Sequence, residues 1–346
     1  MHEIEFKGTH YEIGNSYGSL AYAKGFRVKR LSHIDLDKKF IDESETVVRN
    51  VFPEILEEIR GFADGCKGTY EQLTSFLLGI GVNNDAPKCS CFAVKSKTTT
   101  FLARNHDYIK AFKKHTDSSL IVPRGGYAFL GQSDVFIGRE DGINEKGLGI
   151  GMTFVGGGVI KPGINFILAG RYVLEKCDSV NDAVKVLSNM QLSTSQNFVL
   201  ADHSGDIAVV EASPGKVAVR YPEPNSSYII ATNNFRDQDM LSFEKTGDRN
   251  WYQSLTRYDS IFAALEACPR TVDIAYCKEI LSGEHGFVCQ YKRWGRFDTL
   301  WSIVADLSTV VIERTAGNPS RTKYKEDMRL SSLARRREKR ETGQAL

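Results

Sequence analysis

The segment Cys89-Ser90-Cys91-Phe92-Ala93-Val94 is followed, after Lys95-Ser96-Lys97-Thr98, by Thr99-Thr100-Phe101-Leu102-Ala103-Arg104-Asn105-His106-Asp107. Two β-type runs, 91–94 and 99–103, flank the polar stretch 95–98, and this spacing predicts a β-hairpin. A hairpin brings the start of its first strand beside the end of its second strand. Cys89 is therefore expected to lie near Arg104 and Asp107.

This expected neighbourhood points to cysteine chemistry. A thiol beside a guanidinium has a lowered pKa and a larger thiolate fraction, which makes the cysteine nucleophilic. Asp107 would hold an amine or fix the arginine. A buried cysteine beside a surface Arg/Asp pair explains the spacing equally well, so the hairpin alone leaves both interpretations open.

The predicted secondary structure changes at Lys88. Residues 1–80 are predicted to be mostly helical, because 11–23 and 51–63 have apolar residues at three- and four-residue intervals. Beyond residue 88, strands grouped in hairpins alternate with groups of helices, which favours antiparallel sheets with helical layers, an α+β fold. The predicted helices there are 166–176, 180–190 and 255–267, and the predicted strands include 128–130, 148–155, 197–201, 207–211, 217–219, 228–232, 299–305 and 309–314.

Composition excludes several classes of protein. The chain has 346 residues, 41% hydrophobic and 25% charged, with a formal net charge of +2, which is typical of a globular protein and gives no reason to expect nucleic-acid binding by its body. No apolar run approaches the roughly 18–20 residues of a membrane-spanning helix. The N-terminal stretch carries Glu3 and Glu5 and lacks the apolar core of a signal peptide, so a cytoplasmic location is expected.

Seven cysteines, an odd number spread over the chain, argue against a disulfide framework and for a reducing compartment. No C-x2-C pair is present, and Cys89 and Cys91 are too close in sequence for ordinary paired zinc ligands. Nothing in the sequence implies a metal or an organic cofactor.

The C-terminal segment is strongly basic, with five basic residues among 335–340. A nucleic-acid or membrane arm would have this composition, but so would a frayed, solvated helix or tail. We expect residues 326–346 to form a basic, flexible tail.

The hairpin motif also resembles a known family. Cys-Ser-x-Phe followed by Ala-Arg-Asn-x-Asp is similar to the nucleophile hairpin of the N-terminal-nucleophile hydrolases, in the branch with choloylglycine hydrolases, acid ceramidase and acyl-CoA:6-aminopenicillanate acyltransferase. Further motifs fit that branch in the same order: 141–149, 201–205, 231–233 and 254–258. The segments 8–18, 58–65, 299–302 and 316–319 are similar to the acyltransferase family in particular, so the resemblance extends over residues 8 to about 320.

The resemblance implies a fold and a domain organisation. The fold is expected to be a four-layer αββα sandwich with two antiparallel sheets face to face. Residues 1–88 would form a helical pro-segment that stays bound as a small subunit, and residues 89–325 would form the catalytic domain.

The resemblance also implies a mechanism. The Cys89 thiol would attack the Lys88 carbonyl, and water would hydrolyse the resulting thioester, so that Cys89 becomes N-terminal. Its α-amine, with an ordinary pKa of about 7.7–8.0, would then serve as the base for its own thiol. This mechanism needs no histidine, and the histidines, His106 among them, are expected to be packing or surface residues.

Roles for five further residues follow from the matched motifs. Arg104 would line the site beside the thiol, and Asp107 would orient the α-amine. Asn233 would donate a hydrogen bond to the developing oxyanion, with Thr153 in the place of a second oxyanion asparagine. Arg257 would support the polar network.

Three positions depart from the family pattern. Lys88 replaces the glycine common before the nucleophile, Ala103 replaces the glycine that often precedes the Arg-Asn pair, and Thr153 has a shorter reach than asparagine. In addition, Cys91 is a rival nucleophile two residues from Cys89.

The function expected from the resemblance is hydrolysis of a linear amide in a small molecule through a cysteine thioester. An acyltransferase that passes the acyl group from acyl-CoA or an amide to an amine is the closest alternative. A protein of this fold that binds without cleaving, and an adaptor acting through the basic tail, are two further alternatives. The oligomeric state, including a homo-oligomer, is left open.

Overall fold

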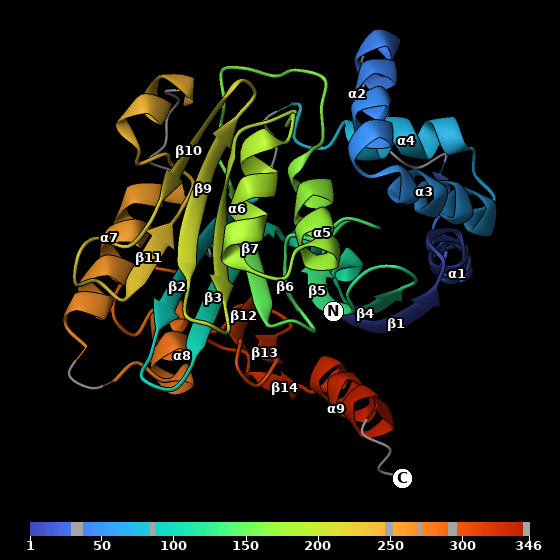
Figure 1. Ribbon diagram of the computed structural model, residues 1–346. Helices are drawn as coiled ribbons and strands as arrows, with labels where there is room; N and C mark the ends of the chain where they lie inside the picture. Colours follow the sequence, from blue (N-terminus) through green and yellow to red (C-terminus); the bar gives the residue numbers. More distant parts are fainter. Residues whose placement is uncertain (29–36, 84–86, 246–251, 269–270, 290–295, 342–346) are drawn as a thin grey trace.

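The computed structural model describes residues 1–28, 37–83, 87–245, 252–268, 271–289 and 296–341. These residues form two β-sheets between two layers of helices (Figure 1). The centre of the predicted loop before Cys89, 84–86, and the end of the predicted tail, 342–346, lie outside the described residues. No helix in the described part of the chain is long and apolar enough to cross a membrane.

The six-stranded sheet contains the predicted hairpin at its centre. Its strand order is β11-β2-β3-β12-β13-β14, with every neighbouring pair antiparallel. The strands are β2 (Lys88–Lys95), β3 (Thr100–Ile109), β11 (Tyr228–Ala231), β12 (Phe297–Asp306), β13 (Val311–Thr315) and β14 (Lys325–Asp327).

Strand β2 is buried on both faces because helices cover one face of its sheet and the other sheet covers the opposite face. Cys91 and Ala93 pack in the layer between the sheets. Phe92 and Val94 point the other way, into the layer under helices α7 (Ser254–Glu266) and α8 (Ile274–Ser282). Since side chains alternate along a strand, Cys89 belongs to the face between the sheets.

The eight-stranded sheet has the order β1-β4-β5-β6-β7-β8-β9-β10. Its outer face is covered by helices α5 (Phe166–Lys176) and α6 (Val180–Asn189) (Figure 1). The expected four-layer sandwich is confirmed, with one parallel pair, β1 and β4, at the edge of this sheet. The strands are β1 (His2–Gly8), β4 (Asp117–Pro123), β5 (Phe129–Ser133), β6 (Asp141–Asn144), β7 (Leu148–Phe154), β8 (Gln196–Asp202), β9 (Ile207–Ser213) and β10 (Lys216–Arg220).

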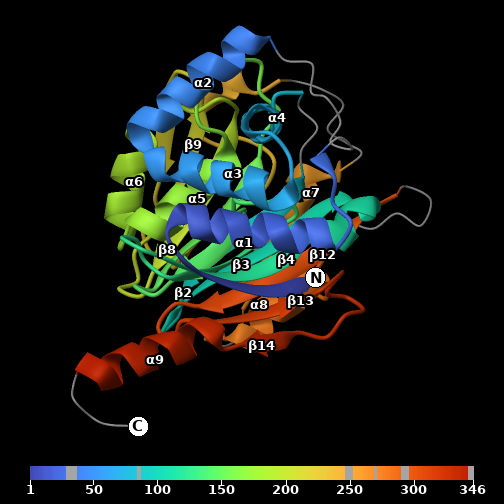
Figure 2. The ribbon, with the colours of Figure 1, turned by 90° about the vertical axis from the view of Figure 1, so that its right-hand side faces the viewer.

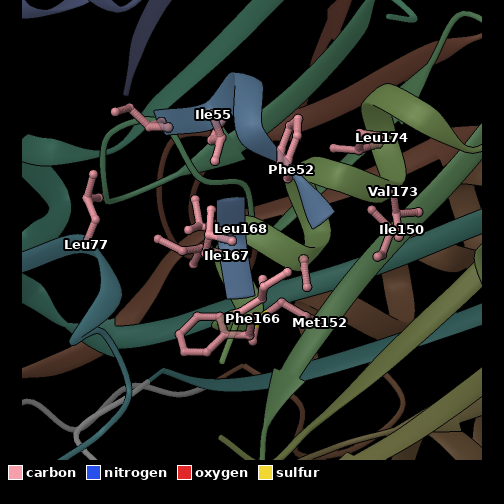
Figure 3. Packing of buried hydrophobic residues seen from close by; sticks show 14 of the residues in the cluster. Phe52, Ile55, Leu77, Ile150, Met152, Phe166, Ile167, Leu168, Val173 and Leu174 are labelled. Carbon is pink, nitrogen blue, oxygen red and sulfur yellow. The ribbon is translucent and has the colours of Figure 1, made fainter. Parts of the chain in front are cut away.

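The helices described before residue 84 pack beside α5 on the outer side of the eight-stranded sheet (Figure 2). These helices, which follow β1, are α1 (His10–Ala23), α2 (Lys38–Val51), α3 (Pro53–Cys66) and α4 (Tyr70–Leu78). Phe52, Ile55 and Leu77 lie in one apolar cluster with Ile167 and Leu168 of α5 (Figure 3). The N-terminal segment therefore shares the hydrophobic core of the outer helical layer.

A buried ionic network joins the same two parts of the chain. Arg171 of α5 donates to both carboxylate oxygens of Glu58 on α3, at 3.0 and 2.8 Å. Arg171 also contacts Glu175, whose other oxygen lies 2.9 Å from Nε2 of His10 on α1. Burial alone would raise the pKa of Glu175, but the bond from His10 and the charge of Arg171 outweigh it and lower that pKa to about 2.

Helices α1 and α3 touch through glycines. Gly14 and Gly18 of α1 face Gly61 and Gly65 of α3, and a Cβ atom at any of these four positions would lie only 1.9–2.3 Å from a backbone oxygen of the other helix. The segments that hold these glycines are among those that resemble the acyltransferase family. Glycine is required at these four positions because the backbones of the two helices are in direct contact.

This contact predicts that Gly61→Ala lowers the free energy of unfolding by about 1–3 kcal/mol or more, because the new methyl group would lie 2.1 Å from the carbonyl oxygen of Tyr11. Denaturant unfolding of the two chains measures the difference. Gly156→Ala is the matched control, since a Cβ there meets no atom within 4 Å, and it should change stability by less than about 1 kcal/mol. Equal stabilities for the two variants would contradict the close packing.

The C-terminal segment that was predicted as a tail begins within β14 and continues as α9 (Arg329–Glu341), at the lower right of Figure 1. Leu330 is buried, and Arg329 contacts Asp327 and Ser118. The start of this helix is thus fastened to the body of the protein. Arg335 and Arg336 are exposed.

Candidate active site

Cys89 lies at the start of β2, wholly buried between the two sheets. It pairs with His106 across the β2–β3 ladder. Nη2 of Arg104, on the same face of β3 as His106, donates a hydrogen bond to Sγ of Cys89 at 3.0 Å. The neighbourhood expected from the hairpin is therefore present for Arg104, and a guanidinium at this distance stabilises a developing thiolate.

Arg104 is held in place by the opposite sheet. Its Nε donates to the carbonyl of Met152 at 2.8 Å, and its Nη1 bonds to the carboxylate of Asp141. Asp141 also accepts a hydrogen bond from the indole of Trp301 at 2.8 Å. Burial alone would lower the pKa of Arg104, but the charges of Cys89 and Asp141 raise it, so this guanidinium stays positive.

Asn233 and Arg257 hold the main chain of Cys89. The N–H of Cys89 donates to Oδ1 of Asn233 at 2.9 Å, and Nη2 of Arg257 donates to the same oxygen at 2.8 Å. Nη1 of Arg257 reaches the carbonyl of Cys89, and also Oγ of Ser90 at 2.8 Å. Cys89 is thereby fixed on both sides of its Cα atom by two residues that the matched motifs had picked out.

The amide nitrogen of Asn233 points toward the chain before Cys89. It donates to the carbonyl of Phe154 at 2.6 Å and more weakly to that of Pro87 at 3.4 Å. The predicted role of Asn233 is to donate a hydrogen bond to a developing oxyanion. In the uncleaved chain this donor contacts the residue before Lys88 only through the weaker of its two bonds.

The side chain of Thr153 makes its hydrogen bonds with Thr232 and Asn197, and not with Cys89. Its hydroxyl donates to the carbonyl of Thr232 and accepts a hydrogen bond of 3.0 Å from Asn197, its partner across β8. Asn197 also donates to the carbonyls of Thr232 and Asn234. The Thr153–Asn197 pair thus supports the backbone turn that carries Asn233, a contact that the resemblance did not indicate.

Asp107 lies opposite Lys88 in the ladder. Its Oδ1 accepts a hydrogen bond from Thr299 at 2.6 Å, while Oδ2 is buried with no hydrogen-bond partner among the described residues. Burial raises the pKa of Asp107 to about 7, against the lowering effects of Arg257 and Thr299. The N–H of Cys89 bonds to Asn233 here, so the expected contact between Asp107 and that nitrogen is absent from the uncleaved chain as described.

His106, which we expected to be a packing or surface residue, lies in this site. Its Nδ1 lies 3.9 Å from Sγ of Cys89 and 3.1 Å from Nη2 of Arg104. Glu140 faces the same nitrogen at 3.0 Å, and Asp134 faces Nε2 at 3.4 Å. The signal was present in the strand period, since His106 follows Arg104 by two residues and must share its face.

His106, Asp134 and Glu140 are also the group of side chains, within the described ranges, that could offer a metal ion three ligands. The two carboxylates, however, face opposite nitrogens of the ring. One ligand atom from each of the three side chains lies within 4.8 Å of the other two, but each carboxylate makes its contact with a different nitrogen of the ring. The arrangement fits an imidazole held between two carboxylates better than a metal site.

Cys91, the rival nucleophile, is placed less favourably than Cys89. It pairs with Arg104 across the ladder and is wholly buried, with its Sγ close to Gly151. Burial raises the pKa of the Cys91 thiol, and the charge of Arg104 offsets this only in part. The hydrogen bond from Arg104 goes to Cys89 and not to Cys91.

Comparison with known proteins gives matches of two kinds. A family described as acyl-coenzyme A:6-aminopenicillanic acid acyl-transferase matches residues 94–321. An uncharacterized protein from Archaeoglobus fulgidus is 21% identical over 82% of this chain, and the chain spans 58% of that relative's length.

Solved structures match the fold. A variant of conjugated bile acid hydrolase from Clostridium perfringens has a TM-score of 0.50 and 17% identity, over 69% of this chain and 92% of that one. Penicillin V acylase from Agrobacterium tumefaciens has a TM-score of 0.48 and 18% identity, over 66% and 83%.

Proposed function

The chain belongs to the acyl-coenzyme A:6-aminopenicillanic acid acyl-transferase family, and from that premise we propose that it is a self-processing hydrolase of linear amides with Cys89 as its nucleophile. The observation that carries the proposal is the hydrogen bond of 3.0 Å from the buried guanidinium of Arg104 to Sγ of Cys89. The grip of Asn233 and Arg257 on the main chain of the same residue supports it.

The first proposed step is cleavage of the chain itself. Sγ of Cys89 attacks the carbonyl carbon of Lys88, the C–N bond between these residues breaks, and the nitrogen of Cys89 takes the thiol's proton. Asn233, whose amide nitrogen contacts the carbonyl of Pro87 in the uncleaved chain, would donate a hydrogen bond to the oxyanion at residue 88. Water then hydrolyses the thioester between residue 88 and Sγ.

The second proposed stage is turnover of a small-molecule amide. The new α-amine of Cys89 takes the proton from Sγ, the thiolate attacks the substrate carbonyl, and the amine product leaves. Asp107, with an unpartnered carboxylate oxygen and a pKa of about 7, is suited to bind that α-amine once it exists. Thr153 would act indirectly, through the turn that carries Asn233.

The burial of Cys89 accounts for the order of these stages. In the uncleaved chain the whole residue is inaccessible to solvent, so a substrate cannot reach Sγ. The amide bond next to Sγ is its own, and cleavage of that bond would open the space before Cys89. The N-terminal segment would stay bound through its shared core and the Arg171–Glu58 pair.

Intact mass of the purified, denatured protein tests the proposal. Two chains of about 10 and 29 kDa, the shares of the 38.7 kDa chain that residues 1–88 and 89–346 make up, are expected, with Cys89 as the new N-terminus. A new N-terminus at Cys91 would transfer the role to that residue. A single chain that stays at 38.7 kDa through long incubation would contradict the proposal and favour a binding protein of the same fold.

Acyl transfer is the second candidate, and the description of the family favours it. The same thioester would react with an amine in place of water. The cleaved enzyme, supplied with an acyl donor and increasing amounts of an amine acceptor, would then form the new amide at the expense of the free acid. Formation of the free acid alone would establish hydrolysis.

A further inference from the structure

The first proposed step lacks a base. In the uncleaved chain the nitrogen of Cys89 is a peptide N–H, and it donates its hydrogen to Asn233. A peptide nitrogen has no basic lone pair, so it cannot take the thiol's proton in the way that a free α-amine can. Self-cleavage therefore needs a group near Sγ that can accept a proton.

His106 places a ring nitrogen close to the thiol. Its Nδ1 lies 3.9 Å from Sγ of Cys89, within the range of a hydrogen bond to sulfur. Its ring is stacked on Trp301, with centroids 3.6 Å apart and planes within 7°. The stacking and the two flanking carboxylates fix the ring with one nitrogen toward the thiol.

The surrounding charges stabilise the imidazolium that forms when this ring takes the proton of Sγ. Glu140 faces Nδ1 and Asp134 faces Nε2, while Arg104, bonded to Asp141, approaches Nδ1 from the same strand. Burial opposes the charged form, but the charge of Glu140 and the bonds to Asp134 and Cys89 outweigh it and raise the pKa of His106 well above its usual value. Burial in turn raises the pKa of Glu140, with the charge of His106 opposing.

We propose that His106, held between Glu140 and Asp134, is the catalytic base of self-cleavage: its Nδ1 takes the proton from Sγ of Cys89 and returns it to the nitrogen of Cys89 as the bond to Lys88 breaks. One proton moves from sulfur to nitrogen, the S–C bond forms and the C–N bond breaks, so the step needs no other reactant. This inference rests on the proposed function. It gives the two stages different bases, His106 before cleavage and the α-amine of Cys89 after it.

Substitution of His106 by glutamine tests the inference, because glutamine keeps a polar side chain and cannot take the proton. Cleavage of freshly folded chains is followed by intact mass over time, at several pH values. We expect His106→Gln to slow cleavage about 10²-fold or more. His203→Gln, a change at an exposed histidine, is the matched control and should cleave at the wild-type rate.

The pH profile separates a base from a merely structural residue. A Cys89–His106 pair that shares one proton should cleave at a nearly constant rate between about pH 6 and 8. Without His106 the proton must go to hydroxide, and the rate should rise about tenfold per pH unit. A His106→Gln chain that cleaves at the wild-type rate with an unchanged profile would overturn the inference. If a metal chelator slowed cleavage of the wild type as much as His106→Gln does, that result would also overturn the inference, in favour of a metal site.

A second measurement does not depend on cleavage. A thiolate absorbs more ultraviolet light than a thiol, and the difference in absorbance between a chain and its Cys89→Ala counterpart reads the thiolate of Cys89 without a reagent that must reach it. We expect this thiolate signal near pH 6 to be at least tenfold weaker in His106→Gln than in the wild type. If neither protein is cleaved but this difference is present, the proposed function fails while the Cys89–His106 pair stands. Equal signals in the two proteins would overturn the pair as well.

Discussion

Replacing Cys89 with alanine is expected to leave a single chain of 38.7 kDa with no amide-cleaving activity. Both proposed stages form their thioester at Sγ of this residue, and loss of such a nucleophile typically costs a factor of about 10⁴ or more in rate. The variant should nevertheless fold, because it removes only one buried sulfur and leaves the main-chain bonds to Asn233 and Arg257 available. Intact mass and circular dichroism measure the two outcomes.

Cys91→Ala is the matched control, since it removes a buried thiol from the same face of the same strand two residues away. The variant should be cleaved before residue 89 at close to the wild-type rate. If Cys89→Ala were cleaved and Cys91→Ala were not, Cys91 would be the nucleophile. Cleavage of both variants would show that another protease acts on the chain, and the proposal of self-processing would be wrong.

Replacing Glu58 with alanine is expected to lower the free energy of unfolding by about 3–5 kcal/mol. Glu58 accepts both hydrogen bonds of a two-pronged contact from Arg171, and both side chains are wholly buried. The substitution leaves a buried guanidinium whose remaining carboxylate partner is Glu175. Denaturant unfolding, in the Cys89→Ala chain so that cleavage does not intervene, measures this loss.

Two controls define the cause. Glu57→Ala changes the adjacent residue, which forms a loose, exposed pair with Arg60, and should shift stability by less than about 1 kcal/mol. Replacing Glu58 and Arg171 together by methionine should recover most of the loss, because no charge is then left buried. A Glu58→Ala chain as stable as Glu57→Ala would mean that this network does not hold the N-terminal segment in place.

The elements that follow from local pattern were predictable. Helix α5 has the predicted bounds, and α6 begins at the predicted residue 180, where Ser179 caps it. The hairpin was predictable because its strands and turn are contiguous in sequence. Helix α8 was not predicted although its signals are present, an N-cap at Asp273 and a left-handed Gly283 at its end.

Strand β1 could not be predicted in the same way. Its residues are largely exposed, and its pairing partner β4 begins more than a hundred residues later, so no local pattern marks the pair. The parallel edge of the eight-stranded sheet is a tertiary feature.

The residues around Cys89 also fall into those that a local pattern predicted and those that it did not. Arg104 was found because it lies across a hairpin, whereas Asn233, Thr153 and Arg257 were found only through the resemblance. Glu140 and Asp134 lie in the connection between β5 and β6 of the other sheet, and their approach to His106 depends on how the two sheets face each other. The position of His106 in the sequence therefore did not indicate that two carboxylates would lie beside its ring.

The parallel strand at the start of the chain has a consequence for self-association. β1 forms the outer edge beside β4, whose seven residues are all buried, and it turns Glu3, Glu5 and Lys7 to the solvent. Charged residues on an edge strand discourage other chains from adding to a sheet. Loss of residues 2–8 would leave the backbone N–H and C=O groups of β4 open to a second molecule. The segment that the proposed cleavage would separate from the catalytic part is thus also the segment that guards its sheet against aggregation.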